Sequence, residues 1–158
     1  MLLHHASAAA ASGQRRALGT VDSAGTGAYH AGAAPDRRTA AVLRAHGVAV
    51  PARGARVLDA EDWARFDFIL AMDAENLADV RAAERRARRR EAGFTERARA
   101  SVALFGDFGG QVGEEVGDPY YGGVDGFERA FEQCERFAKG FLKALEEEEG
   151  EEDGEDES

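Results

Sequence analysis

The chain has 158 residues, of which 44% are hydrophobic and 32% charged, which suits one domain with a modest core. Its net charge is −10, but ten of the 30 acidic residues lie within residues 146–158, so the rest of the chain is neutral. The single cysteine, Cys134, excludes an internal disulfide, a cysteine-rich zinc site and a dithiol redox pair. No apolar run approaches the length of a membrane span, about 18 residues. We therefore expect a soluble protein in a reducing, cytoplasmic compartment.

The two ends of the chain differ in composition from the middle. Residues 1–18 are rich in alanine and serine and contain no apolar run of strand length, so we expect a disordered or unrelated leader. Residues 146–158 are almost entirely acidic, which predicts a solvated, disordered tail. The folded domain is expected over residues 19–145.

Between these ends, short β-like runs alternate with helical patterns, which indicates an α/β fold. Strands are predicted at 20–26, 68–72 and 102–105, and the continuous apolar run at 68–72 is typical of a strand buried on both faces. Helices are predicted over about 35–46, 59–66, 73–90 and 124–147. In the last helix apolar residues recur every three or four positions, at Phe127, Phe131, Cys134, Phe137, Phe141 and Leu145. Cys134 is therefore expected to belong to the core.

Several short motifs carry no chemistry. Gly25 and Gly27 begin a G-x-G pattern, but His30 stands where a dinucleotide fingerprint needs its third glycine. The four histidines lack the spacing of metal ligands, so neither a metal nor a cofactor is expected. The arginine-rich run 85–90 continues an amphipathic helix and has no interleaved aromatic residues. We interpret it as a solvated face and expect no nucleic acid as a partner.

Four motifs occur in a characteristic order: Asp22-Ser23-Ala24-Gly25-Thr26, Pro35-Asp36, Phe66-Asp67-Phe68-Ile69-Leu70-Ala71-Met72-Asp73 and Asp118-Pro119-Tyr120-Tyr121. Over residues 19–145 this order resembles the low molecular weight protein tyrosine phosphatases. The resemblance implies a three-layer α/β fold with a parallel sheet flanked by helices, and hydrolysis of phosphotyrosine or aryl phosphate esters. The related arsenate reductases share this architecture but depend on cysteines that the chain lacks.

The resemblance also assigns roles to individual residues. Asp118 corresponds to the general acid, which protonates a leaving phenolate whose conjugate acid has a pKa of about 10. Tyr120 and Tyr121 correspond to an aromatic wall against the phosphotyrosine ring. Ser23 corresponds to a supporting residue that holds the phosphate-binding loop in shape.

The family's nucleophile has no counterpart in the printed sequence. In the family a cysteine, five residues, an arginine and a serine or threonine form the phosphate loop after the first central strand. Residues 1–19 contain no cysteine, and the residue six positions after Cys134 is Gly140. The resemblance thus implies that the first central strand is missing. We expect the 20–26 strand to move beside the 68–72 strand, or the domain to be marginally stable.

Three hypotheses follow for function. The chain is an inactive member of the phosphatase family, or an N-terminally incomplete form whose first coding segment was replaced in a gene model or splice form. Alternatively, it is a pseudophosphatase that acts as a protein-binding module through Tyr120 or Tyr121. An intact form would take a phosphotyrosine protein or an aryl phosphate as its partner. The sequence specifies no oligomeric state.

Overall fold

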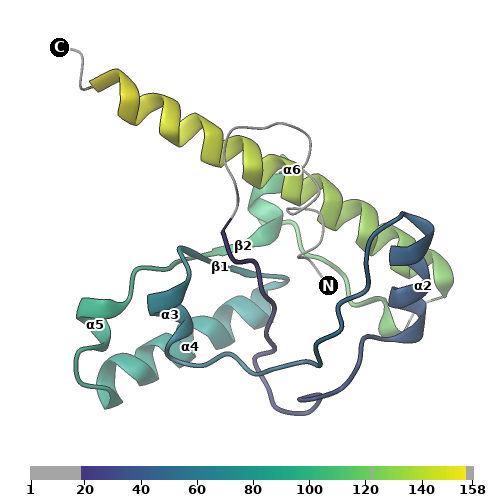
Figure 1. Ribbon diagram of the computed structural model, residues 1–158, viewed down its shortest axis with the longest axis horizontal. Helices are drawn as coiled ribbons and strands as arrows, with labels where there is room; N and C mark the ends of the chain where they lie inside the picture. The colour runs from purple at the N-terminus through teal and green to yellow at the C-terminus, as the bar shows by residue number, and fades with distance from the viewer. Residues whose placement is uncertain (1–18, 122, 156–158) are drawn as a thin grey trace.

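A computed structural model describes residues 19–121 and 123–155 (Figure 1). Two short parallel strands, β1 (Phe68–Ala71) and β2 (Ser101–Leu104), pair in register from Phe68 with Ser101 to Ala71 with Leu104. The connection between them contains helix α4 (Ala74–Arg90) and the short helix α5 (Phe94–Arg97). Such a crossover is what two parallel neighbouring strands require.

Helices cover both faces of this small sheet. Ile69 and Val102 pack against a buried cluster that includes Val80 and Ala87 of α4. On the other face, Leu70 packs against a cluster that includes Phe137 of helix α6 (Val124–Glu155). Successive strand residues point to opposite faces, so β1 contributes to both layers. Figure 1 shows α4 on one side of the two strands and α6 on the other. The predicted three-layer α/β fold is confirmed.

Helix α6 carries most of the aromatic core. Its predicted apolar stripe faces inward, and the Phe137 side chain is fully buried. The first turns pack against α2 (Arg37–Ala45), and the middle packs against a 3-10 helix, η1 (Phe105–Gly109). A Cβ atom at Gly140 would collide with the carbonyl oxygen of Phe108. Glycine at this position therefore allows α6 to approach η1 closely.

The strand predicted at residues 20–26 is wrong. Only Gly25 forms a bridge there: its N–H donates to Arg56 (2.8 Å), and its carbonyl accepts from Leu58 (3.0 Å). Within the described residues β1 pairs with β2 alone, so the segment has not moved beside β1. A strand needs a continuous partner for its backbone groups, and Asp, Ser and Gly have low strand propensity. Within the described residues β1 has a partner strand on one edge alone. Three of its four residues are therefore half-buried, where burial on both faces was predicted.

The helix ends mostly follow the capping signals. Asp73 caps α4 by accepting the Asn76 N–H at 2.6 Å, and Gly47 follows α2 with a positive φ of 70°. Helix α3 (Asp62–Arg65) begins later than predicted. Helix α6 continues to Glu155, where a disordered tail was expected from residue 146. Glutamate is a good helix former and no proline interrupts the segment, which accounts for the difference. Residues 1–18, the predicted leader, lie outside the described residues.

Candidate functional site

The loop that contains Asp118 lies at the surface, in the connection between η1 and α6. Asp118 is exposed, and its Oδ1 accepts the Tyr120 N–H at 2.9 Å, which closes the loop onto the 3-10 turn η2 (Pro119–Tyr121). Pro119 packs against Gly126 in the first turn of α6. The loop thus presents the predicted general acid to solvent in a defined conformation. For Tyr121 the structure describes the backbone alone.

Arg38 of α2 fixes the aromatic part of this loop. Its Nη1 donates to the Tyr120 carbonyl oxygen at 3.3 Å. Its guanidinium lies over two rings, 5.3 Å from the centroid of Tyr120 and 4.5 Å from that of Phe127. A cation between two ring faces is held by both quadrupoles. Tyr120 therefore stays 59% exposed while its position is tied to α2 and α6.

Asp36 in turn positions Arg38. Its Oδ2 accepts from Arg38 Nη2 at 2.9 Å, and its Oδ1 accepts from both the Nε (3.1 Å) and the backbone N–H (2.8 Å) of Arg38. The hydrogen bonds from Arg38, first from its side chain and then from its backbone, lower the pKa of Asp36 to about 2. The carboxylate is thus charged throughout the physiological range and serves both as the N-cap of α2 and as the counter-ion of Arg38.

A groove of about 790 Å³ lies beside Asp118. Four carboxylates line it, together with two guanidinium groups: Glu114, Glu115, Asp118 and Glu132, with Arg129 and Arg136. Arg136 is already bound to Glu114 and to the Gly109 carbonyl. The remaining charge is predominantly negative, so this groove disfavours a phosphate dianion.

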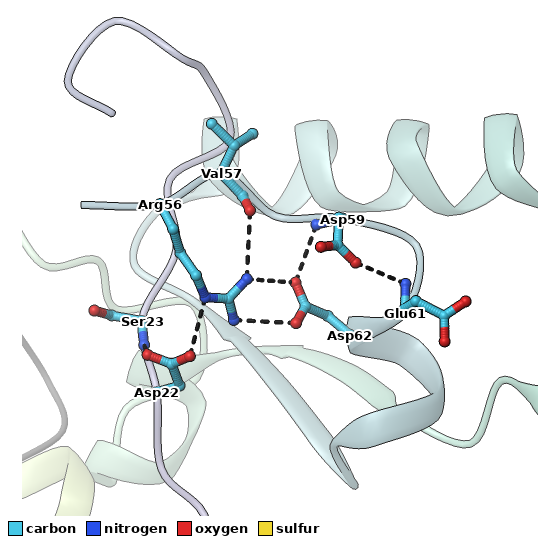
Figure 2. Close-up of polar contacts among 7 residues, drawn as sticks. All are labelled: Asp22, Ser23, Arg56, Val57, Asp59, Glu61 and Asp62. Carbon is cyan, nitrogen blue, oxygen red and sulfur yellow. Dashed lines mark hydrogen bonds and ion pairs between the residues drawn. The ribbon is translucent and has the colours of Figure 1, made fainter. Parts of the chain in front are cut away.

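A second polar cluster surrounds Arg56, on the extended segment that precedes α3 (Figure 2). Its guanidinium binds Asp62 with two bonds, Nη1 to Oδ2 at 2.8 Å and Nη2 to Oδ1 at 3.0 Å, while Nε donates to Asp22 Oδ2 at 3.0 Å. The Asp62 side chain is only 5% exposed. Its Oδ2 also accepts the Asp59 N–H at 3.0 Å. Arg56 therefore joins the 20–26 segment to α3 and satisfies a buried carboxylate.

The same cluster sets the protonation of its members. Burial alone would raise the pKa of Asp22, but the hydrogen bond from the Ser23 N–H and the contacts with Arg56 outweigh it, so the pKa lies below its ordinary value. The hydrogen bonds that Arg56 donates to Asp62 raise the pKa of Arg56. Asp22 and Arg56 are therefore both charged at neutral pH.

Ser23 lies apart from the Asp118 loop. Its N–H donates to Asp22 Oδ1 at 2.9 Å, and its hydroxyl makes no hydrogen bond to any described residue. The residue is exposed. The structure therefore does not bring Ser23 into contact with Asp118 or Tyr120, and its supporting role stays a prediction.

Cys134 is the only thiol, and it lies in the core of α6. It is 6% exposed and packs with Phe105, Phe137 and Ala138. Burial raises its pKa to about 11. A thiol with this pKa is almost entirely protonated at neutral pH and is a poor nucleophile. The predicted structural role of Cys134 is confirmed by its surroundings.

The arrangement matches a known family of enzymes. The family model described as low molecular weight phosphotyrosine protein phosphatase matches residues 6–151. The chain belongs to this family. A family member from Schizosaccharomyces pombe is 39% identical over 121 residues, which are 76% of this chain and 70% of that protein. The human low molecular weight phosphotyrosine protein phosphatase is 35% identical over 116 residues, 73% and 68% of the two chains.

Solved structures of phosphatases have the same fold as this family member. A Drosophila arginine phosphatase has a TM-score of 0.76 at 26% identity, covering 91% of this chain and 87% of that one. A protein tyrosine phosphatase from Entamoeba histolytica has a TM-score of 0.65 at 31% identity, covering 81% and 76%. The resemblance inferred from the four motifs is thus confirmed at the level of family and fold.

Two residues that organise this phosphatase-family site were not singled out from the sequence. No local pattern marks Arg38, because its partners Tyr120 and Phe127 lie more than 80 positions away along the chain. Arg56 lies outside the four motifs that carry the resemblance. One signal for it exists in the sequence, since an arginine directly before the apolar pair Val57-Leu58 and close to Asp59 and Asp62 predicts a paired cation.

The described part of the chain contains neither a metal site nor a membrane-spanning helix. Its histidine, cysteine and acidic side chains form no group of three or more that could hold a metal ion. None of the helices within residues 19–121 and 123–155 is long and apolar enough to cross a membrane.

Proposed function

We propose that this 158-residue chain keeps the proton-donor loop of its family but does not itself hydrolyse phosphate monoesters. One observation carries the proposal: its single cysteine is buried in the core with a pKa raised to about 11. The residue six positions further on is Gly140, which α6 needs for its contact with η1. Neither the thiol nor an arginine at this spacing is therefore available to attack phosphorus and bind its oxygens.

Asp118, the predicted general acid, cannot replace a nucleophilic thiol and a phosphate-binding arginine. General acid catalysis contributes a factor of about 10² to 10⁴. Positioning and charge stabilisation of the phosphoryl group usually contribute more. The groove beside Asp118 is lined mainly by carboxylates, which repel the phosphate dianion. Hydrolysis of phosphotyrosine proteins or aryl phosphates would need a Cys-x5-Arg segment, which the printed sequence lacks.

The test is hydrolysis of para-nitrophenyl phosphate at mildly acidic pH by the purified 158-residue chain. We expect the same rate with the wild type, with Asp118→Asn and with the control Asp125→Asn, which changes a neighbouring exposed acid. All three rates should equal the buffer blank. Turnover that is lost in Asp118→Asn and kept in Asp125→Asn would overturn the proposal.

A protein-binding module is the second candidate function, and the geometry of Tyr120 favours it. The ring is 59% exposed, yet Arg38 holds it in place. An aromatic side chain fixed at the surface loses little entropy on binding. Under this proposal, a partner isolated with the full chain loses affinity with Tyr120→Ala, and retained affinity would contradict it. A free thiol fits a cytoplasmic location for such a module, which fractionation of cells would test.

A further inference from the structure

The outward face of α4 carries an uncompensated positive charge. Helical positions four residues apart lie on one face, and the arginines repeat at this spacing opposite the buried Val80 and Ala87. Arg88 pairs with Glu84. The other arginines of the C-terminal half are exposed and form no ion pair with any described residue: Arg81, Arg85, Arg86, Arg89 and Arg90. These five are called the arginine face below.

The helix dipole explains only part of this face. Basic residues stabilise the C-terminal end of a helix, and the effect is confined to the last turn. Arg81 and Arg85 lie one to two turns further in, and Arg85 and Arg89 repel each other at a spacing of four residues. Helix stability alone therefore does not account for so many unpaired arginines.

The end of α6 has the opposite imbalance. Leu145 of this helix is buried, Glu146 and Glu147 are exposed, and the helix continues to Glu155 beyond the body of the domain (Figure 1). Eight of the ten residues from 146 to 155 are acidic, and the last turn has no basic residue. Acidic residues at the C-terminal end of a helix oppose its dipole and repel one another. This segment, residues 146–155, is called the acidic extension.

The two charged surfaces do not meet within one molecule. The arginine face lies on α4, which covers one side of the sheet, whereas α6 covers the other side and its end points away from α4 (Figure 1). A continuous helix cannot fold back to cross the sheet. A complementary surface of the same chemistry is therefore within reach in another copy of the chain.

We propose that the arginine face of α4 binds the acidic extension of a second copy of this chain. Pairing in both directions gives a symmetric dimer in which each copy contributes one basic and one acidic surface. The contact relieves repulsion within both helices at once. Exposed ion pairs are individually weak and screened by salt, so the dimer is expected to be low in affinity and sensitive to ionic strength. This inference does not depend on the proposed loss of catalysis.

The first experiment is sedimentation velocity of the full chain over a range of concentrations. At about 0.01 M salt, where the Debye length is about 30 Å, we expect a concentration-dependent dimer. At about 1 M salt, where it is about 3 Å, we expect a monomer. A monomer at every concentration in low salt would overturn the proposal, and so would a dimer that persists unchanged in high salt.

Charge-reversal variants identify the two surfaces. Variant A carries Arg85→Glu and Arg89→Glu, and variant B carries lysine at residues 146–149. Each alone is expected to weaken dimerisation by about tenfold or more, because attraction is replaced by repulsion. An equimolar mixture should dimerise again, since the reversed helix of A meets the reversed extension of B and the native pair is restored in the other direction.

The matched control reverses Arg37 and Arg44, two exposed arginines of α2 that make no ion pair with any described residue. This variant changes the net charge as much as variant A does and should dimerise like the wild type. If the control and variant A lose dimerisation equally, net charge alone explains the loss, and the assignment of the arginine face as the binding surface is overturned. Failure of the mixture to associate would do the same, and so would binding of a nucleic acid oligomer without any self-association. All of these positions are exposed, and far-UV circular dichroism checks the fold of each variant.

Discussion

Replacement of Arg56 by methionine tests the energetic role of the cluster in Figure 2. The variant keeps an unbranched side chain of similar length but removes three hydrogen bonds to carboxylates, two to Asp62 and one to Asp22. Asp62 then remains buried, with the Asp59 N–H as its one remaining donor. An uncompensated buried carboxylate is the costly product of this substitution.

The expected loss in the free energy of unfolding depends on how far the ion pair of Arg56 and Asp62 is exposed to water. Removing one member of a buried ion pair costs about 3–5 kcal/mol. The Arg56 side chain is 32% exposed, so water can enter the space it leaves and reduce this cost to about 3 kcal/mol. For a chain of this size such a loss lowers the melting temperature by about 10 °C.

Urea unfolding followed by tryptophan fluorescence measures this loss. Trp63 is the only tryptophan, is 1% exposed and is the immediate neighbour of Asp62, so it reports directly on the cluster. Arg44→Met is the control, because Arg44 is exposed and has no ion pair within the described residues. A loss below about 1 kcal/mol in Arg56→Met, or an equal loss in the control, would refute this account of a buried carboxylate satisfied by one cation.

A double-mutant cycle separates the two ion pairs of Arg56, one with Asp62 and one with Asp22. The Asp62 side chain is 5% exposed and accepts two hydrogen bonds from Arg56, whereas that of Asp22 is 19% exposed and accepts one from Arg56. The coupling free energy with Arg56 should therefore be larger for Asp62→Asn than for Asp22→Asn. The reverse order would show that burial does not control the strength of these pairs.

Three further predictions concern the core and the titrating groups. Phe137→Ala should lower the free energy of unfolding by about 3–5 kcal/mol, since this ring is fully buried, while the same change at the half-buried Phe66 should cost clearly less in the same urea titration. Cys134 should react with a disulfide reagent at mildly alkaline pH only in denaturant, because its pKa is raised to about 11; rapid reaction of the native protein would contradict this. The folded pKa of Asp36, about 2, lies below its ordinary value, so its charge stabilises the fold above that ordinary value and the effect is lost as the pH falls. The difference in unfolding free energy between wild type and Asp36→Asn should accordingly be constant near neutral pH and shrink between about pH 4 and 2, and a difference that grows with acidification would contradict the pairing with Arg38.

The elements that could be predicted from the sequence are those with local causes. Helix α4 begins at the Asp73 cap, and the stripe containing Val80 and Ala87 identifies its buried face. The same holds for the aromatic stripe of α6. In each case the signal lies within a few turns of the chain, so no distant partner is needed to interpret it.

The predictions that failed depend on distant partners. Residues 20–26 have strand-like features, but a strand forms only when a neighbour pairs with its backbone along its whole length, and Val57 offers a single bridge. The contacts of Arg38 could not be predicted from the sequence either. They form because α6 packs on α2 and brings Phe127, more than 80 positions away, next to Arg38. Sequence patterns specify which residues are apolar or charged, but tertiary packing decides which of them meet.

The conformation of the Asp118 loop is determined by contacts that do not involve phosphate chemistry. Arg38 binds the Tyr120 carbonyl and both neighbouring rings, and Pro119 packs on Gly126. Asp118 itself accepts one hydrogen bond, from its own loop, and is exposed. The persistence of this loop is therefore explained by the packing of α2 and α6, whether or not a reaction occurs. Only the carboxylate of Asp118 distinguishes a catalytic loop from a structural one, which is why its replacement, and not that of Arg38, tests the function.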